Sequence, residues 1–153
     1  NLERTVCALK GIDCILTIVG RLNQAQKDYL ENSGIRYVLK SNLSDEEIVM
    51  EYEDCDIVAF ISLFEGFGMP VIEANMVGRP VICSTIPVLK EVAGNSAVFV
   101  NPLDVNDMHD GFVRLFNDSA LREQCVIKGL ENVKRFNSSY ITEQYVNLYD
   151  SLV

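Results

Sequence analysis

The sequence predicts an α/β protein with a Rossmann-like parallel sheet and helices on both faces. Short apolar runs rich in valine and isoleucine alternate along the chain with helical segments, which is the pattern of a parallel sheet covered on both sides. A length of 153 residues is typical of a single domain. Of these residues 48% are hydrophobic, which is normal for a protein with a globular core. We therefore expect a single domain over residues 1–153, without an internal repeat or linker.

Local signals place the individual elements. Ser44 and Glu47 have the spacing of a capping box, Gly34 and Gly78 are placed to end helices, and Pro70 fits the first position of another helix. The expected strands cover residues 12–19, 35–39, 56–62 (a buried strand), 80–83 and 97–100. The expected helices cover residues 2–9, 24–32, 44–54, 70–77, 88–93, 104–117, 119–136 and 138–152.

Composition excludes several classes of function. The net charge of -9 argues against nucleic acid or an anionic membrane surface as the main partner. No apolar run reaches the roughly 18 residues that span a bilayer, and the N-terminus does not read as a signal peptide. The five cysteines show no Cys-x-x-Cys spacing, so we expect buried free thiols in a reducing compartment. The one histidine, His109, lies in a polar run and is expected on the surface of a helix.

The most informative stretch runs from Glu65 to Glu73. It follows an apolar run that we expect to be a strand, and ligands of parallel sheets bind outside the carboxyl ends of the strands. Gly66 and Gly68 let the backbone approach a ligand closely, and the free N–H groups of the following helix turn can receive an anion. The arrangement suits a ligand that carries both hydroxyl groups and phosphate.

Several stretches between Asp54 and Pro102 carry a resemblance to a known family. They are Asp54-Cys55-Asp56, Ser62 to Pro70, Glu73-Ala74, Gly78 to Ile82, Glu91 to Gly94 and Val100 to Pro102. The chain resembles the C-terminal half of a retaining glycosyltransferase with the two-domain GT-B type fold, and most of all family 4 of these enzymes. The resemblance extends over about residues 1 to 150.

The resemblance implies a role for each residue of the loop and helix. Glu65 would bind hydroxyls of the donor sugar and stabilise charge at the transition state, which makes it the catalytic candidate. The residues expected to bind the sugar and the diphosphate through backbone N–H groups are Gly66, Phe67, Gly68, Met69 and Val71. Pro70 has no N–H to offer. Glu73 would accept hydrogen bonds from the ribose hydroxyls, as a carboxylate can from a cis-diol.

The resemblance also implies what lies outside this chain. The family holds the diphosphate with an arginine and a lysine that belong to the first strand and loop of this half, so we expect that strand and those cations before Asn1. The acceptor, a glycan or lipid-linked glycan, would bind the N-terminal domain. No metal or cofactor is expected, because members of the family of this kind commonly need no metal. The whole enzyme would transfer a hexose such as mannose or glucose. It would work in the cytoplasm, either free or peripherally at the inner membrane face through that domain, and the isolated chain would be inactive.

The sequence departs from the family at Ser41, which stands where a glycine often lets the base approach. Simpler interpretations remain beside the functional ones. Glu65 could be a solvated loop residue, Glu73 could be favoured by the helix dipole, and Arg79 is best read as a helix-end cation. The rival functions are a non-catalytic α/β module that binds phosphate or a partner, and a nucleotide-sugar epimerase of the same fold. The tyrosines of the last helix are read as core or domain-interface residues.

Overall fold

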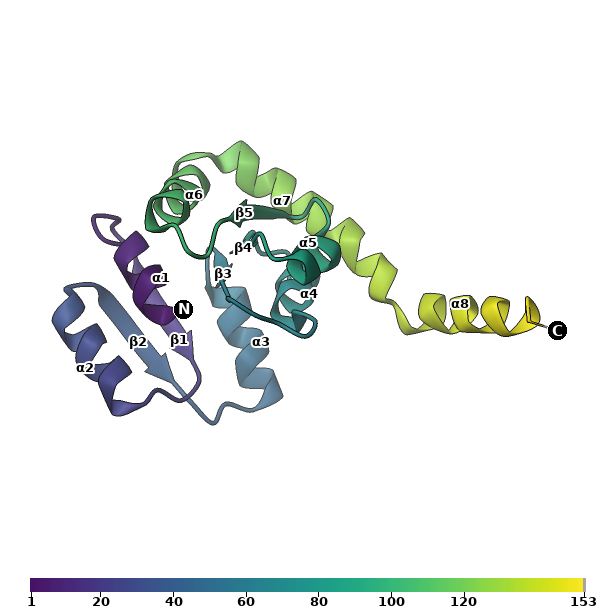
Figure 1. Cartoon of the computed structure of the whole chain (residues 1–153), viewed down its shortest axis with the longest axis horizontal. Coiled ribbons are helices and arrows are strands. Elements are labelled where there is room, and N and C mark those ends of the chain that lie inside the picture. The colour runs from purple at the N-terminus through teal and green to yellow at the C-terminus, as the bar shows by residue number, and fades with distance from the viewer. Residues whose placement is uncertain (153) are drawn as a thin grey trace.

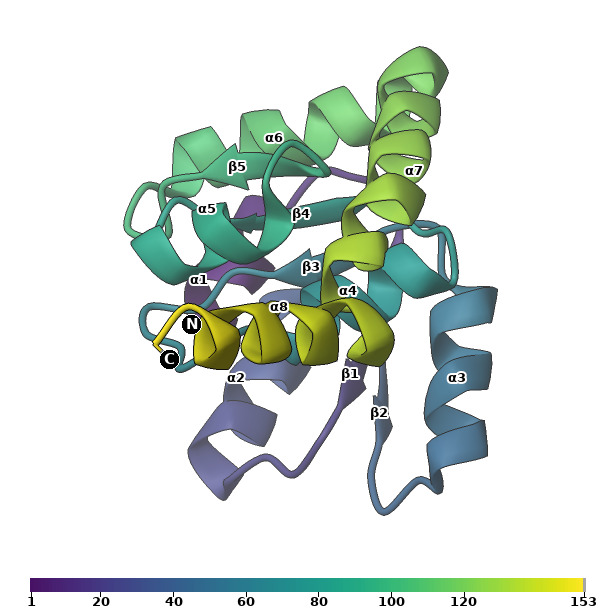
Figure 2. The ribbon, with the colours of Figure 1, turned by 90° about the vertical axis from the view of Figure 1, so that its right-hand side faces the viewer.

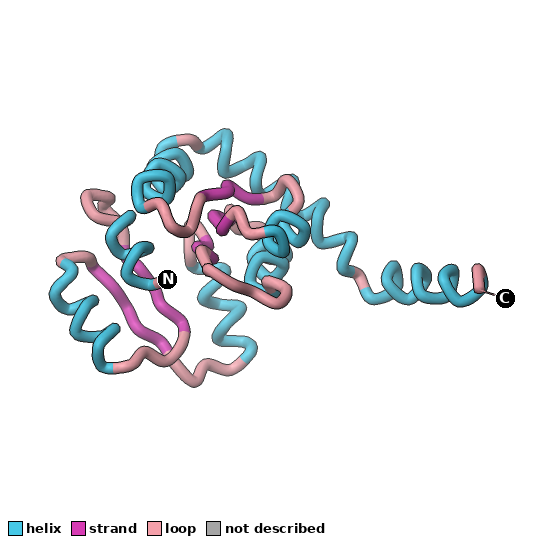
Figure 3. Tube along the Cα trace, in the orientation of Figure 1, coloured by secondary structure: helices cyan, strands magenta, loops and turns pink. Residues whose placement is uncertain are grey.

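The computed structural model describes residues 1–152 and has the expected α/β architecture, with its strands in two parallel sheets (Figures 1 and 3). In the first sheet, β1 (Ile15–Val19) pairs with β2 (Arg36–Lys40). In the second, the order is β3 (Val58–Phe60), β4 (Val81–Ser84) and β5 (Ala97–Val100). All of these pairs are parallel, as the sequence predicts.

The helices alternate with the strands as expected. They are α1 (Leu2–Ala8), α2 (Gln24–Ser33), α3 (Asp45–Asp54), α4 (Met69–Met76), α5 (Pro87–Ala93), α6 (Val105–Asn117), α7 (Ser119–Asn132), the 3₁₀ turn η1 (Val133–Phe136) and α8 (Ser138–Asp150). Ser44 caps α3 with both halves of a capping box, and Gly34 ends α2 in the left-handed conformation at φ 77°. Helix α4 begins one residue earlier than expected, at Met69, with Pro70 in its first turn.

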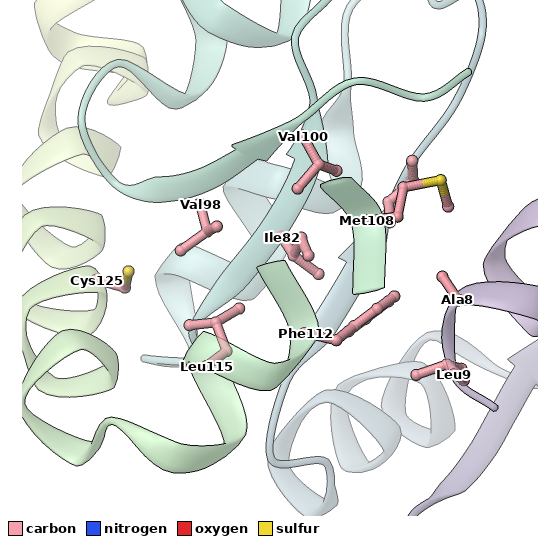
Figure 4. Packing of buried hydrophobic residues seen from close by; sticks show 10 residues of the cluster. Ala8, Leu9, Ile82, Val98, Val100, Met108, Phe112, Leu115 and Cys125 are labelled. Atoms are coloured by element: carbon pink, nitrogen blue, oxygen red, sulfur yellow. The ribbon is translucent and has the colours of Figure 1, made fainter. Parts of the chain in front are cut away.

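The second sheet is covered on both faces. On one face, Ile82, Val98 and Val100 pack against α1 and α6, where Phe112 reaches toward the sheet (Figure 4). On the other face, α4 and α5 bury the apolar residues Val71, Ile72, Ala74, Leu89, Val92 and Ala93. Because α4 is fixed against the sheet in this way, the loop that precedes it has a rigid support.

The first sheet is open on one side. Ile15 and Val19 of β1 are 59% and 49% exposed, although they belong to an apolar run. They line a cavity of about 840 Å³ that also touches α3, β3 and Pro70. The expected buried strand over residues 56–62 is also only partly realised, since β3 spans Val58–Phe60 and its residues are exposed or half-buried. The cavity thus separates the two sheets.

The N-terminus lies beside this break. The side chain of Asn1 donates hydrogen bonds to the carbonyl oxygens of Ile61, at 3.1 Å, and Pro102, at 2.9 Å. Ile61 directly follows β3, so the start of α1 is held at the carboxyl ends of the strands. A parallel strand that ran into Asn1 through a short loop would lie between β1 and β3. The first strand that is expected before Asn1 stays a prediction.

Helix α8 projects away from the rest of the molecule (Figure 1), so in the view turned by 90° it lies in front of the other elements (Figure 2). Its residues Tyr140, Tyr145 and Tyr149 are 48%, 57% and 64% exposed, so the interpretation of these tyrosines as core residues is wrong for this chain. Their interpretation as interface residues stays a prediction. Among residues 1–152, no helix combines the length and the apolar character needed to cross a membrane.

Candidate functional site

The loop between β3 and α4, residues 61–68, lies at the carboxyl edge of the second sheet. Its start is tied to the neighbouring strand, because the buried Ser84 hydroxyl at the end of β4 donates to the carbonyl oxygen of Ser62 at 2.5 Å. Asn1 holds the carbonyl of Ile61 from the other side. The sequence places Glu65 on a strand-end loop, and the structure agrees.

The two glycines of the loop differ in what the fold demands of them. Gly68 has φ 106°, and a Cβ atom there would lie 2.5 Å from Cδ2 of the buried Leu89. Both the backbone conformation and the packing therefore require glycine at this position. At Gly66, a Cβ atom would meet nothing within 4 Å and φ is not in the left-handed region. The packing of this chain gives no reason for a glycine at position 66.

The start of α4 offers fewer free donors than the sequence suggests. Gly68 is the N-cap residue and has no side chain that could cap the helix. The backbone N–H of Val71 donates to the carbonyl oxygen of Gly68 at 3.0 Å. Since Pro70 has no N–H, Met69 is the residue of this turn whose amide is best placed to receive an anion.

Glu65 is half-buried, and within residues 1–152 its carboxylate makes no hydrogen bond or ion pair. Its neighbour Phe64 is 86% exposed, so this stretch of the loop reaches into solvent. Phe67 is anchored, because its ring packs edge-on against Phe136 of η1 with ring centroids 6.0 Å apart. Loop residues 61–68 hold no lysine or arginine, so a diphosphate bound here would need cations from elsewhere.

Glu73 lies in the second turn of α4 and has a partner. The hydroxyl of Tyr52, on α3, donates to Oε2 of Glu73 at 2.8 Å. Burial raises the pKa of Tyr52 well above its usual range, and the hydrogen bond to Glu73 adds to the effect. The phenol of Tyr52 therefore stays protonated at physiological pH, and its hydroxyl can donate to Glu73. Sequence reasoning missed Tyr52, because nothing in the local pattern around it points to α4.

The other polar candidates have structural roles. Arg79 donates to the carbonyl oxygen of Glu53 at the end of α3, which agrees with its interpretation as a helix-end cation. Arg21 donates to Oδ1 of Asn42 at 2.7 Å, and both are exposed. Nδ1 of His109 lies 2.7 Å from the carbonyl oxygen of Ala8, so this half-buried histidine ties α6 to the end of α1.

All five cysteines are free thiols, as the sequence predicts, but the prediction that they are buried holds only in part. Cys83 and Cys125 are buried, and the other three are half-buried. Burial raises the pKa of Cys83 to about 12, so this thiol stays protonated and is not a nucleophile.

The parallel sheets with helices on both faces are the fold of a glycosyltransferase of the GT-B type. Comparison with known proteins makes the assignment specific. Residues 2–131 match the family "Glycosyl transferases group 1", and the chain belongs to this family.

Individual relatives agree with this assignment. The chain is similar to the O-antigen chain mannosyltransferase B of Escherichia coli, with 32% identity over 118 residues, which is 77% of this chain and 30% of that protein. It is similar to an MMP alpha-(1->4)-mannosyltransferase of Mycolicibacterium hassiacum, with 26% identity over 95% of this chain and 41% of that protein. Among solved structures, a sucrose-phosphate synthase from Thermosynechococcus elongatus superposes with a TM-score of 0.82 at 26% identity. That match covers 99% of this chain and 42% of the synthase. The chain thus spans about a third of these relatives.

Proposed function

We propose that this chain is the donor-binding domain of a retaining hexosyltransferase, over residues 1–153, and that it binds a nucleoside diphosphate sugar at the loop between β3 and α4. The observation that supports this most is the pair of carboxylates, one on the strand-end loop and one in the second turn of α4. Glu65 has no partner among residues 1–152, and Glu73 is oriented by Tyr52. Carboxylates accept hydrogen bonds from hydroxyl pairs, which both the sugar and the ribose of such a donor present.

The two carboxylates take different parts of the donor. Glu65 lies on the loop, where it contacts the sugar and stabilises the charge that develops as the bond to the diphosphate breaks. Glu73 accepts hydrogen bonds from the ribose. Gly66, Phe67 and Gly68 place backbone groups against the sugar, and Met69 donates to the diphosphate. Val71 joins Met69 only when its N–H leaves the carbonyl of Gly68.

The rest of the enzyme supplies what this chain lacks. Cations from the strand before Asn1 hold the diphosphate, and the N-terminal domain binds the glycan or lipid-linked glycan acceptor. The reaction needs no metal, because positioning and those cations neutralise the leaving diphosphate. The mannosyltransferases among the relatives support mannose as the first sugar to test, with glucose second. The enzyme works in the cytoplasm, at most peripherally at the membrane.

The test is calorimetry on the full-length enzyme with a panel of nucleoside diphosphates and their mannose and glucose conjugates. We expect one nucleoside diphosphate to bind best, and the matching nucleotide sugar to be turned over with retention at the anomeric carbon. If no compound of the panel binds, the rival function is favoured, which is a non-catalytic module that binds a partner. Conversion of the nucleotide sugar to its epimer, without transfer to an acceptor, would favour an epimerase.

A further inference from the structure

The hydroxyl of Tyr52 joins α3 to the proposed ribose-binding carboxylate, Glu73. Tyr52 OH lies 2.8 Å from Oε2 of Glu73, and the half-buried tyrosine packs against the buried core cluster that contains Val71 and Ala74. Because the pKa of Tyr52 is raised by burial, its hydroxyl donates and does not exchange roles with the carboxylate. The bond therefore has a fixed direction.

The position of the hydroxyl is fixed from several sides. The capping box of Ser44 sets the start of α3, and the Sγ–H of Cys55 donates to the carbonyl oxygen of Tyr52 at 3.3 Å. Arg79, which follows α4, donates to the carbonyl oxygen of Glu53. Helices α3 and α4 are thus joined both at Tyr52–Glu73 and at their ends. A small rotation of the Tyr52 ring would have to disturb this packing.

The chemistry of the pair restricts the ligand. With Tyr52 bound at Oε2, the carboxylate keeps Oε1 and the second lone pair of Oε2, and all of these are acceptors. An acceptor-only carboxylate repels a phosphate and favours a group that brings hydroxyl donors. A ribose with free 2′ and 3′ hydroxyls meets this requirement, and a 2′-deoxyribose offers one donor fewer.

We propose that Tyr52 is a positioning residue that orients Glu73, and that the pair makes the site select ribonucleoside over 2′-deoxyribonucleoside diphosphates. This inference rests on the proposed function, since it needs Glu73 at the ribose. Tyr52 does not itself touch the donor. Its effect passes through the orientation of one carboxylate.

The experiment measures binding of the preferred ribonucleoside diphosphate and of its 2′-deoxy and 2′,3′-dideoxy analogues to the full-length enzyme by calorimetry. Tyr52→Phe keeps the ring and removes the hydroxyl. We expect it to weaken ribonucleotide binding by about three- to tenfold, because the carboxylate remains but loses the hydrogen bond that orients it. Binding of the dideoxy analogue should not change. In kinetics, KM for the donor should rise while kcat stays within about twofold, because the lost interaction is the same in the ground state and the transition state.

Two further variants make the result decisive. Tyr29→Phe is the matched control, because it also removes a hydrogen-bonded tyrosine hydroxyl. That hydroxyl contacts Cys7 and Glu3 on α1 and not α4. The control should leave nucleotide binding unchanged. Glu73→Ala tests the proposed function itself. If Glu73→Ala leaves affinity unchanged, the ribose site is wrong. If Glu73→Ala weakens binding but Tyr52→Phe does not, or weakens ribo and dideoxy ligands equally, the positioning role of Tyr52 is wrong.

Discussion

At the scale of single residues, the site is defined by the contrast between two carboxylates and between two glycines. Glu65 is free within the described chain, and Glu73 is held by Tyr52. Gly68 is required by the fold, whereas Gly66 is not. A residue that the fold does not require, in a loop at the carboxyl end of a strand, is a candidate for contact with a ligand.

Alanine substitutions at the two glycines should therefore have opposite effects. Gly68→Ala combines an unfavourable φ with a clash against Leu89, so it should lower the free energy of unfolding by about 1–3 kcal/mol. Gly66→Ala should change stability by less than about 0.5 kcal/mol but weaken binding of the nucleotide sugar about tenfold, because the added methyl group would meet the sugar. Urea denaturation and calorimetry measure the two effects. A Gly66→Ala enzyme with unchanged donor affinity would show that the ligand does not approach this backbone.

At the scale of elements, a buried cluster of polar side chains joins α4 to α7 and to Ser96. Oδ1 of the buried Asn75 accepts hydrogen bonds from the Ser96 hydroxyl, at 2.8 Å, and from Nδ2 of Asn132 on α7, at 3.1 Å. The closest approach of α7 to Asn75 is at Gly129, where a Cβ atom would lie 2.8 Å from Nδ2 of Asn75. This contact fixes the helix that carries Glu73.

Gly129→Ala should therefore lower the free energy of unfolding by about 1–2 kcal/mol, even though alanine favours a helix. The same substitution in an Asn75→Ala background should be neutral or stabilising, because the clashing side chain is gone. A double-mutant cycle measured by chemical denaturation compares the two backgrounds. Equal effects of Gly129→Ala in both would mean that Asn75 does not limit the approach of α7.

The elements also show which features a sequence can predict. Helices α2 and α3 begin where their caps indicate, because a capping box and a C-terminal glycine act over a few adjacent residues. The loop with Glu65 was placed correctly for the same reason. The tie between Tyr52 and Glu73 spans 21 residues and depends on how two helices pack, which no local pattern encodes. Likewise, the apolar run around Ile15 predicts burial, but Ile15 and Val19 line the cavity between the sheets and are 59% and 49% exposed, which the run itself does not encode.

At the scale of the whole molecule, the dominant feature is the cavity between the two sheets. Its wall includes the exposed apolar side chains of Ile15 and Val19, and Asn1 lies at the carboxyl edge beside it. A parallel strand in this place would make the strand order that of a doubly wound fold, with the switch point next to the Glu65 loop.

A strand that fills the cavity between the sheets should stabilise the molecule. The test adds a five-residue strand of valine and isoleucine, joined to Asn1 by a short flexible loop. We expect it to raise Tm by about 5–10 °C, because it would bury two half-exposed apolar side chains and each kcal/mol of stability raises Tm by about 2–4 °C. The matched control has the same length but carries two prolines, which cannot donate to a neighbouring strand. Hydrogen exchange of β1 and β3 amides should slow with the first extension and not with the second. Equal Tm values for both would rule out a strand in this cavity.

The central claim is that Glu65 acts on the sugar and Glu73 on the nucleotide. The measurement that tests it most directly is steady-state kinetics beside calorimetry on Glu65→Gln in the full-length enzyme. A group that acts on developing charge lowers turnover more than ground-state binding. We expect kcat to fall about a hundredfold or more, while affinity for the free nucleoside diphosphate stays within about threefold, or ~0.7 kcal/mol. In the parallel Glu73→Ala enzyme, nucleoside diphosphate binding should weaken by about 1.5–3 kcal/mol. Equal losses of turnover and nucleotide affinity in Glu65→Gln, or turnover close to normal, would contradict the account.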